Sequence, residues 1–162
     1  MKGAKKPTVY LESTVVSYAV GRISRIPENA RKQKFTREWW KTELHQFTPV
    51  VSTYVFGEIS DGDDKLSVER RKLVVSFRLL LDSDAIDELA KDYIRVTKLP
   101  EKARLDAYHI ACATIYEIDY LVSWNLNHIL NGFIRKMIEE INRVQGVSTP
   151  IICTPEELTE VP

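Results

Sequence analysis

The stretch VYLESTVVSYAVG, residues 9–21, decides the fold because it joins an apolar strand to a helix through a carboxylate. Val9, Tyr10 and Leu11 have the character of a short buried strand, and Glu12 follows them directly. A charged side chain is costly inside a core, but it is well placed at the rim of a sheet. The sequence therefore puts Glu12 at a strand end, where other polar groups can meet it.

The rest of the chain alternates strand-like and helical patterns. Besides residues 8–11, strand-like runs occupy residues 49–53, 79–85 (the weakest), 119–124 and 150–153. Three of these runs are continuously apolar, which favours strands covered on both faces and hence a parallel sheet. Helical patterns begin after Thr53 and cover residues 29–47, 67–81, 84–96, 101–117 and 127–144. This alternation predicts a layered α/β fold.

Length and composition indicate one soluble domain over residues 1–162, since no linker or repeat divides the chain. The 23 basic and 23 acidic residues balance, so a nucleic-acid partner must be held by local patches. Cys112 and Cys153 lack metal-site spacing, and we expect buried thiols in a reducing compartment. The sequence shows no membrane span or secretory signal, which favours a cytoplasmic protein.

Four polar residues are expected at one edge of the sheet. Glu12 and Asn125 each follow a strand, and Glu58 lies about one and a half turns into the helix after the second strand. Asp106 shares the core-facing side of its helix with Ile110, near the start of that helix. In an open parallel sheet, sites form at the carboxyl ends of the strands. Carboxylates gathered there must share protons or bind a hard cation, and Mg²⁺ or Mn²⁺ suits oxygen ligands.

Each of these residues also has an ordinary structural interpretation. Glu12 could stand beside a helix cap formed by Ser13 or Thr14, and Glu58 could be a solvated helix acid. Asp106 could favour the start of its helix electrostatically. Asn125 alone is typical of a turn. His109 and His128 are expected as surface or packing histidines, so the metal hypothesis depends on the set of acids.

Other motifs give no competing chemistry. The acidic segment DGDDKLSVE at Asp61 has its glycine misplaced for a calcium loop, and we interpret it as a turn and helix cap. We find no glycine-rich phosphate loop and no context for a serine nucleophile. Trp39 and Trp40 are adjacent, so we expect one to pack inward and the other to face a partner.

The order of four motifs resembles the PIN-domain family, which includes the VapC-like toxins of toxin–antitoxin pairs. The matching segments are VYLESTVVSY, STYVFGEI, ARLDAYHIACA and DYLVSWNLNHI. The resemblance covers nearly the whole chain, through the closing PIICTPEEL. It implies a three-layer α/β/α sandwich with a central parallel five-stranded sheet. It also implies a Mg²⁺ or Mn²⁺ site at the sheet rim and hydrolysis of RNA phosphodiester bonds.

The chain departs from this family pattern at two positions. The first acid of the family is usually Asp, and Glu12 is one methylene longer. The fourth acid is also usually Asp, whereas Asn125 brings an amide oxygen without a charge. Asp119 precedes the fourth strand and lies at its opposite end, so it does not replace the missing acid.

Together these observations predict a metal-dependent ribonuclease, the toxin of a toxin–antitoxin pair. Glu12, Glu58 and Asp106 would hold the metal, with Asn125 at the fourth catalytic position. Ser13 and Ser123 would orient waters or ligands behind them. The expected partners are RNA, an antitoxin protein and a second copy of the chain. Candidate phosphate contacts are Arg22, Arg25, Arg31, Lys98, Lys102 and Arg104.

Two alternatives remain open at this stage. The neutral Asn125 favours a catalytically weakened or inactive module that keeps an RNA- or protein-binding surface. A nuclease acting on single-stranded or flapped DNA would use the same acids. An RNA-cleavage assay with and without a chelator separates these hypotheses.

Overall fold

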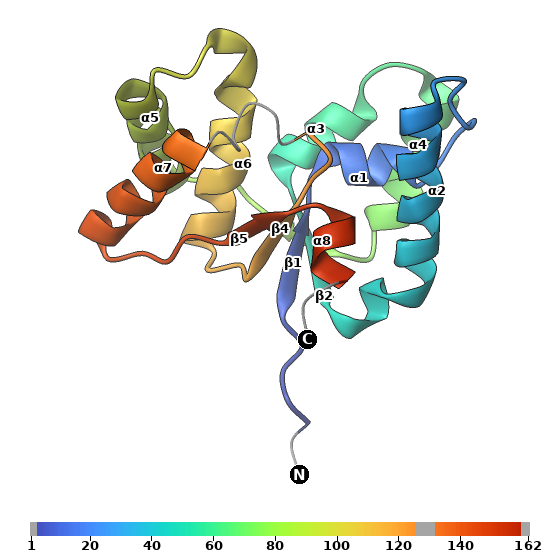
Figure 1. The fold of residues 1–162 in the computed structure, drawn as a ribbon, viewed down its shortest axis with the longest axis horizontal. Coiled ribbons are helices and arrows are strands. Elements are labelled where there is room, and N and C mark those ends of the chain that lie inside the picture. The colour runs from blue at the N-terminus through green and yellow to red at the C-terminus, as the bar shows by residue number, and fades with distance from the viewer. Residues whose placement is uncertain (1–2, 126–131, 160–162) are drawn as a thin grey trace.

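Strand β1 (Thr8–Leu11) lies at the centre of a parallel sheet (Figure 1). The structure is a computed structural model, and it describes residues 3–125 and 132–159. Within these residues the sheet has five strands in the order β3-β2-β1-β4-β5, and every neighbouring pair is parallel. The other strands are β2 (Thr48–Ser52), β3 (Arg78–Leu80), β4 (Tyr120–Val122) and β5 (Ile151–Cys153).

Helices cover both faces of this sheet, which confirms the three-layer α/β/α sandwich. They are α1 (Ser13–Tyr18), α2 (Pro27–Thr42), α3 (Thr53–Ser60), α4 (Asp64–Val74), α5 (Asp84–Thr97), α6 (Arg104–Ile115), α7 (Gly132–Gln145) and α8 (Pro155–Thr159). Helices α5, α6 and α7 lie on one side of the sheet, and α2, α4 and α8 lie on the other (Figure 1). Such two-sided cover is what continuously apolar strands require.

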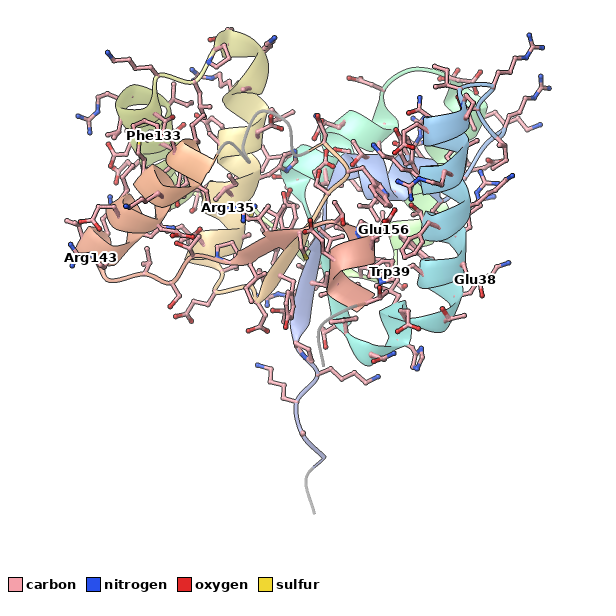
Figure 2. The ribbon with its side chains drawn as sticks, viewed as in Figure 1. Glu38, Trp39, Phe133, Arg135, Arg143 and Glu156 are labelled. Carbon is pink, nitrogen blue, oxygen red and sulfur yellow. The ribbon has the colours of Figure 1, made fainter. Side chains whose placement is uncertain are left out.

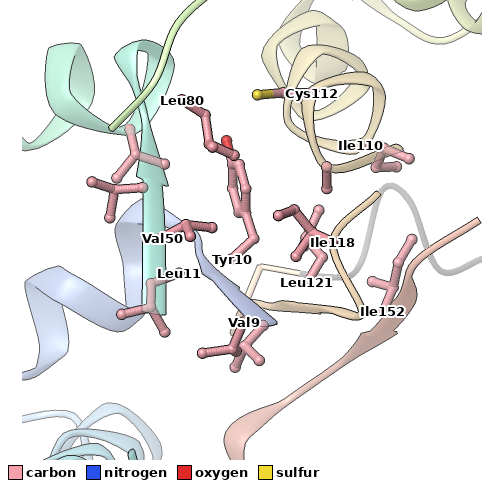
Figure 3. Close-up of a cluster of buried hydrophobic side chains, with 14 of the residues drawn as sticks. Val9, Tyr10, Leu11, Val50, Leu80, Ile110, Cys112, Ile118, Leu121 and Ile152 are labelled. Atoms are coloured by element: carbon pink, nitrogen blue, oxygen red, sulfur yellow. The ribbon is translucent and has the colours of Figure 1, made fainter. Parts of the chain in front are cut away.

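The central strand is buried from Val9 to Leu11. Val9, Tyr10 and Leu11 have no exposed surface, and Figure 3 shows the Tyr10 ring reaching from β1 towards Leu80 and Cys112. The thiols of Cys112 and Cys153 are free and buried, as expected. Burial raises the pKa of each thiol to about 12, so both stay protonated at neutral pH.

One expected helix is wrong at its end. The helix expected at residues 67–81 overlapped the strand expected at 79–85; α4 ends at Val74, and β3 begins at Arg78 and ends at Leu80. Leu79 and Leu81 continue the apolar spacing of the helix, yet both are exposed on the edge of the sheet. An apolar pattern therefore extends past the helix because an edge strand follows it closely.

Two other expected helices are each preceded or followed by a 3₁₀ turn. The pattern at 29–47 divides into α2 and a turn at Leu44–Gln46, and α2 starts earlier because Pro27 suits its first position. The pattern at 101–117 divides into a turn at Glu101–Ala103 and α6. In the pattern at 127–144, residues 127–131, including His128, lie outside the described residues.

Several other expectations are settled by packing around α2 and α4. Asp63 accepts a hydrogen bond from Leu66 N–H at 3.0 Å, so the acidic segment does cap α4. Trp39 is buried, whereas Trp40 is half-buried against Phe77 rather than fully turned outward. Figure 2 labels Trp39 on α2 and Glu156 on α8, two helices that lie in contact.

In the described part of the chain, no helix has the length and apolarity needed to cross a membrane.

Candidate metal centre

Glu12 lies where β1 passes into α1. Its backbone N–H continues the hydrogen bonding between β1 and β4, because it donates to Val122 O at 3.0 Å. Its side chain accepts from Thr14 N–H at 3.0 Å. Glu12 is therefore itself the cap of α1, and the expectation that Ser13 or Thr14 forms the cap is wrong. The extended backbone at Glu12, with φ −74° and ψ 158°, is the usual conformation of a capping residue.

The two carboxylate oxygens of Glu12 have different surroundings. The side chain is only 5% exposed, and Oε2 accepts hydrogen bonds from the Thr14 N–H, the Thr14 hydroxyl and the Ser123 hydroxyl, the last at 2.7 Å. Oε1 lies 3.2 Å from Ser13 Oγ. Three neutral donors thus fix Oε2, while Oε1 keeps lone pairs for another partner.

Glu58 reaches the same place from helix α3. Ser52 at the end of β2 caps α3, accepting from Val55 N–H at 3.2 Å, and Glu58 follows one and a half turns later. Ser13 Oγ is 2.6 Å from Glu58 Oε1, closer than it is to Glu12. The single hydroxyl proton of Ser13 goes to the nearer acceptor, so Glu58 takes it and Glu12 Oε1 is left more open.

His109 holds Glu58 from the other side. The imidazole is 1% exposed, and its Nε2 is 2.6 Å from Glu58 Oε1. Burial alone would raise the pKa of Glu58, but the hydrogen bonds from His109 and Ser13 outweigh it and the pKa lies below its usual value. Glu58 is therefore ionised at neutral pH, which a metal ligand must be.

A buried chain of hydrogen bonds fixes the tautomer of His109. Tyr10 OH is 2.6 Å from His109 Nδ1 and 2.5 Å from Ser52 Oγ. If the Ser52 hydroxyl donates to Tyr10 and Tyr10 donates to Nδ1, then Nε2 carries the proton given to Glu58. Every proton in this chain then has an acceptor, so the neutral Nε2–H form fits best.

Tyr10→Phe is expected to destabilise the fold by about 1–3 kcal/mol, because it leaves the buried Ser52 hydroxyl proton and His109 Nδ1 without their Tyr10 partner. Urea denaturation of the variant and the wild type measures the loss. The matched variant Tyr120→Phe changes a half-buried tyrosine of β4 that packs on Phe47. An unchanged stability in Tyr10→Phe would show that its hydroxyl is not part of the chain.

The sequence-predicted residues are brought together only in part. Ligand atoms of Glu12, Glu58 and His109 lie within 4.8 Å of one another, and in the described residues this group does not include Asp106. Asp106 is half-buried on α6, three residues before His109 and thus on the same side of the helix. The exposed Asn125 donates its N–H to Ser123 Oγ at 2.9 Å.

His109 is the residue that sequence reasoning assigned to surface or packing. It is buried, but it also contacts an acid of the predicted site. The available signal was its spacing from Asp106, since residues three apart share one side of a helix. A lone histidine on an apolar helix gives no further indication, because the contacting Glu58 comes from a distant part of the chain.

The donor set suits a hard divalent cation. Glu12 Oε1 and Glu58 present carboxylate oxygens side by side, and the Nε2–H of His109 is used on Glu58. Oxygen ligands favour Mg²⁺ and Mn²⁺ over metals that prefer imidazole or thiolate. Asp119 takes no part, because its Oδ2 accepts from Thr8 N–H and the Thr8 hydroxyl at the opposite edge of the sheet.

Comparison with known proteins places this geometry in a known fold. No protein-family model and no curated protein sequence matches the chain. Among solved structures, VapC20 of Mycobacterium tuberculosis, described as a sarcin–ricin loop cleaving toxin, superposes with a TM-score of 0.59 at 14% identity over 76% of this chain and 95% of that one. FitAcB of Neisseria gonorrhoeae gives 0.59 at 12% identity over 91% and 97%.

A toxin–antitoxin complex from Klebsiella pneumoniae gives a TM-score of 0.54 at 17% identity, over 76% of this chain and 91% of that one. At these identities the likeness concerns the fold, and the strand order and two-sided helix cover described above agree with it. The chain has the fold of the VapC-like PIN-domain toxins.

Proposed function

We propose that the protein is a metal-dependent ribonuclease. The observation that carries this proposal is the pairing of Glu12 and Glu58 at the carboxyl edge of the sheet. Their ligand atoms lie within 4.8 Å, and no Lys or Arg is among the residues that hydrogen-bond them in the described part of the chain. Two carboxylates so close can share a proton or bind a cation between them.

The residues of the site divide into those that hold the metal and those that hold its ligands. Glu12 and Glu58 would bind it directly, and Asp106 would approach from α6, directly or through water. Ser123, Thr14 and His109 fix the carboxylates, which reduces the freedom lost on binding. When bound, Mg²⁺ or Mn²⁺ polarises a phosphate oxygen and lowers the pKa of a coordinated water.

The toxin role and its partners belong to the same proposal. The Klebsiella structure is described as a toxin–antitoxin complex, and a further one as VapBC2 of Rickettsia felis bound to promoter DNA. An antitoxin that covers this chain would keep the nuclease inactive until it is released. We extend the proposal to a homodimer and to RNA as the substrate.

A cleavage assay tests the function. The purified chain should cut single-stranded RNA in the presence of Mn²⁺ or Mg²⁺, stop with EDTA and recover when metal is restored. Single-stranded DNA of the same sequence is the matched substrate. Cleavage of the DNA alone would contradict the ribonuclease and indicate a DNA nuclease. Cleavage of neither substrate would indicate a non-catalytic binding module.

The second candidate, a non-catalytic module, is favoured by the neutral side chain of Asn125. We expect Asn125→Asp to bind Mn²⁺ roughly 3- to 30-fold more tightly, because a new negative charge near the cation outweighs its own desolvation. Isothermal calorimetry measures both affinities. Ser148→Asp adds the same charge in the exposed loop before β5 and should change nothing. Equal affinities for Asn125→Asp and wild type would place residue 125 outside the site.

A further inference from the structure

A pocket beside the candidate metal centre has a lining that the proposed function does not yet use. It has a volume of about 360 Å³ and is lined by Tyr54, Glu101, Lys102, Arg104, Leu105 and Tyr108. We call it the α6 pocket. Its volume falls within the range of small-molecule sites, roughly 300–1,000 Å³. The α6 pocket lies at the start of α6, where the carboxyl ends of the strands also lie.

Tyr54 connects the α6 pocket to the metal centre. It is four residues before Glu58 on α3, so the two side chains lie one turn apart on the same side. The Tyr54 ring centroid is 6.4 Å from that of His109 and 5.4 Å from that of Tyr108. Helices α3 and α6 are in contact, so the α6 pocket lies close to the candidate metal centre.

The walls of the α6 pocket are aromatic and held in place. The Tyr108 hydroxyl donates to Asp87 Oδ1 at 2.5 Å, and Asp87 also pairs with Lys91 Nζ at 2.7 Å. The Tyr108 ring is therefore fixed before any ligand arrives. Leu105 adds an exposed apolar side chain next to it. Such rings offer stacking surfaces to unpaired bases without a large loss of side-chain entropy.

The rim of the α6 pocket carries two exposed cations. Lys102 and Arg104 are exposed, and the Arg104 guanidinium lies 5.7 Å from the Tyr108 ring centroid. Glu101 is the one acid among the lining residues. Asp87 beside the pocket is paired with Lys91, so Lys102 and Arg104 are the lining groups that can contact a phosphate of a nucleic acid.

We propose that the α6 pocket binds one unpaired base of a single-stranded RNA, with its phosphate on Arg104 and Lys102. This inference rests on the proposed function, because it names the part of the substrate next to the cleavage site. The base takes the place of the Arg104 guanidinium over the Tyr108 ring, next to Tyr54, and Arg104 turns to the phosphate. The α6 pocket thus favours single strands and loops over duplex RNA, whose bases are already stacked.

The test measures RNA binding without catalysis, by fluorescence anisotropy of a labelled single-stranded RNA in EDTA. Tyr108→Ala should weaken binding roughly 10-fold, the loss expected for one stacked base. Tyr108→Phe keeps the ring and should bind almost as wild type. Arg104→Ala, at an exposed position that does not threaten folding, should also weaken binding and reduce its dependence on salt.

The chain supplies a matched control pair. Arg78 lies 5.5 Å from the Tyr116 ring centroid, the same cation–ring contact at the far end of α6. Tyr116→Ala and Arg78→Ala should leave RNA binding unchanged. Equal losses in the two pairs would overturn the proposal, because they would show a general effect of surface charge and folding.

A second RNA with abasic nucleotides separates stacking from charge. Tyr108→Ala should have little effect on this RNA, whereas Arg104→Ala should weaken its binding as before. If wild type cleaves RNA but no variant of the α6 pocket changes RNA affinity, the proposed base-binding role of the pocket is wrong and the proposed ribonuclease function is not affected. If the variants lose RNA affinity but wild type never cleaves RNA, the ribonuclease function is wrong and the base-binding role is supported. Variants that bind RNA as wild type but no longer bind a protein partner would also overturn the base-binding role.

Discussion

Glu58→Gln is expected to reduce Mn²⁺-dependent RNA cleavage by more than roughly 100-fold, because even residues that only support metal ligands change affinity or activity by roughly 10–100-fold. The amide keeps an oxygen that can accept from Ser13 and His109, so the local hydrogen bonds can survive. What disappears is the negative charge beside Glu12. Initial cleavage rates and calorimetric Mn²⁺ titrations measure the two losses.

The control for this variant is Glu88→Gln, which removes the same charge from an exposed position on α5. It should cleave as wild type. Because the Glu58 side chain is about a third exposed, at 34%, Glu58→Gln should also unfold near the wild-type midpoint. A variant that folds normally and still cleaves at the wild-type rate would remove Glu58 from the metal centre.

Leu121→Ala is expected to destabilise the protein by about 2–5 kcal/mol, the usual cost of a cavity at a fully buried leucine. Leu121 lies in the middle of β4, 1% exposed, and Figure 3 shows it beside Ile118 and near Tyr10. Its strand carries Ser123 to Glu12, so the core and the metal centre share this support. Urea denaturation with a common slope measures the change.

Leu79→Ala is the matched substitution, a leucine in the middle of the edge strand β3 that is 44% exposed. It should cost less than half as much as Leu121→Ala, because less apolar surface leaves the core. Equal losses at the two positions would contradict the sheet order, in which β4 is covered on both faces and β3 lies at the edge.

The fold could be predicted from local patterns because its central strands are continuously apolar. Residues 8–11 were predicted with the boundaries that β1 has, and β2, β4 and β5 lie close to their predicted ranges, but β3 ends at Leu80 instead of residue 85. The end of α4 stayed open between a helix to residue 81 and a strand from residue 79, since apolar residues continue past Val74 into an edge strand. The spacing of apolar residues shows which side chains are apolar, but it does not show at which residue a helix ends and a strand begins.

The site was predictable only as far as strand ends indicate it. Glu12 and Glu58 follow strands that pair directly, so their meeting follows from the parallel sheet. The role of Glu12 as a helix cap and the contact of His109 with Glu58 depend on side-chain directions. The buried chain through Tyr10 and Ser52 joins residues up to 99 positions apart, between Tyr10 and His109, and no local pattern reports it.

The most direct test of the central claim is the position of Mn²⁺ in crystals of the protein, located by anomalous scattering. One peak is expected at the carboxyl edge of the sheet, at a ligand distance of roughly 2.0–2.3 Å from carboxylate oxygens of Glu12 and Glu58, with Asp106 bound directly or through water. The peak should vanish in Glu58→Gln crystals. A peak elsewhere, or none at a Mn²⁺ concentration that supports full RNA cleavage, would contradict the metal centre described here.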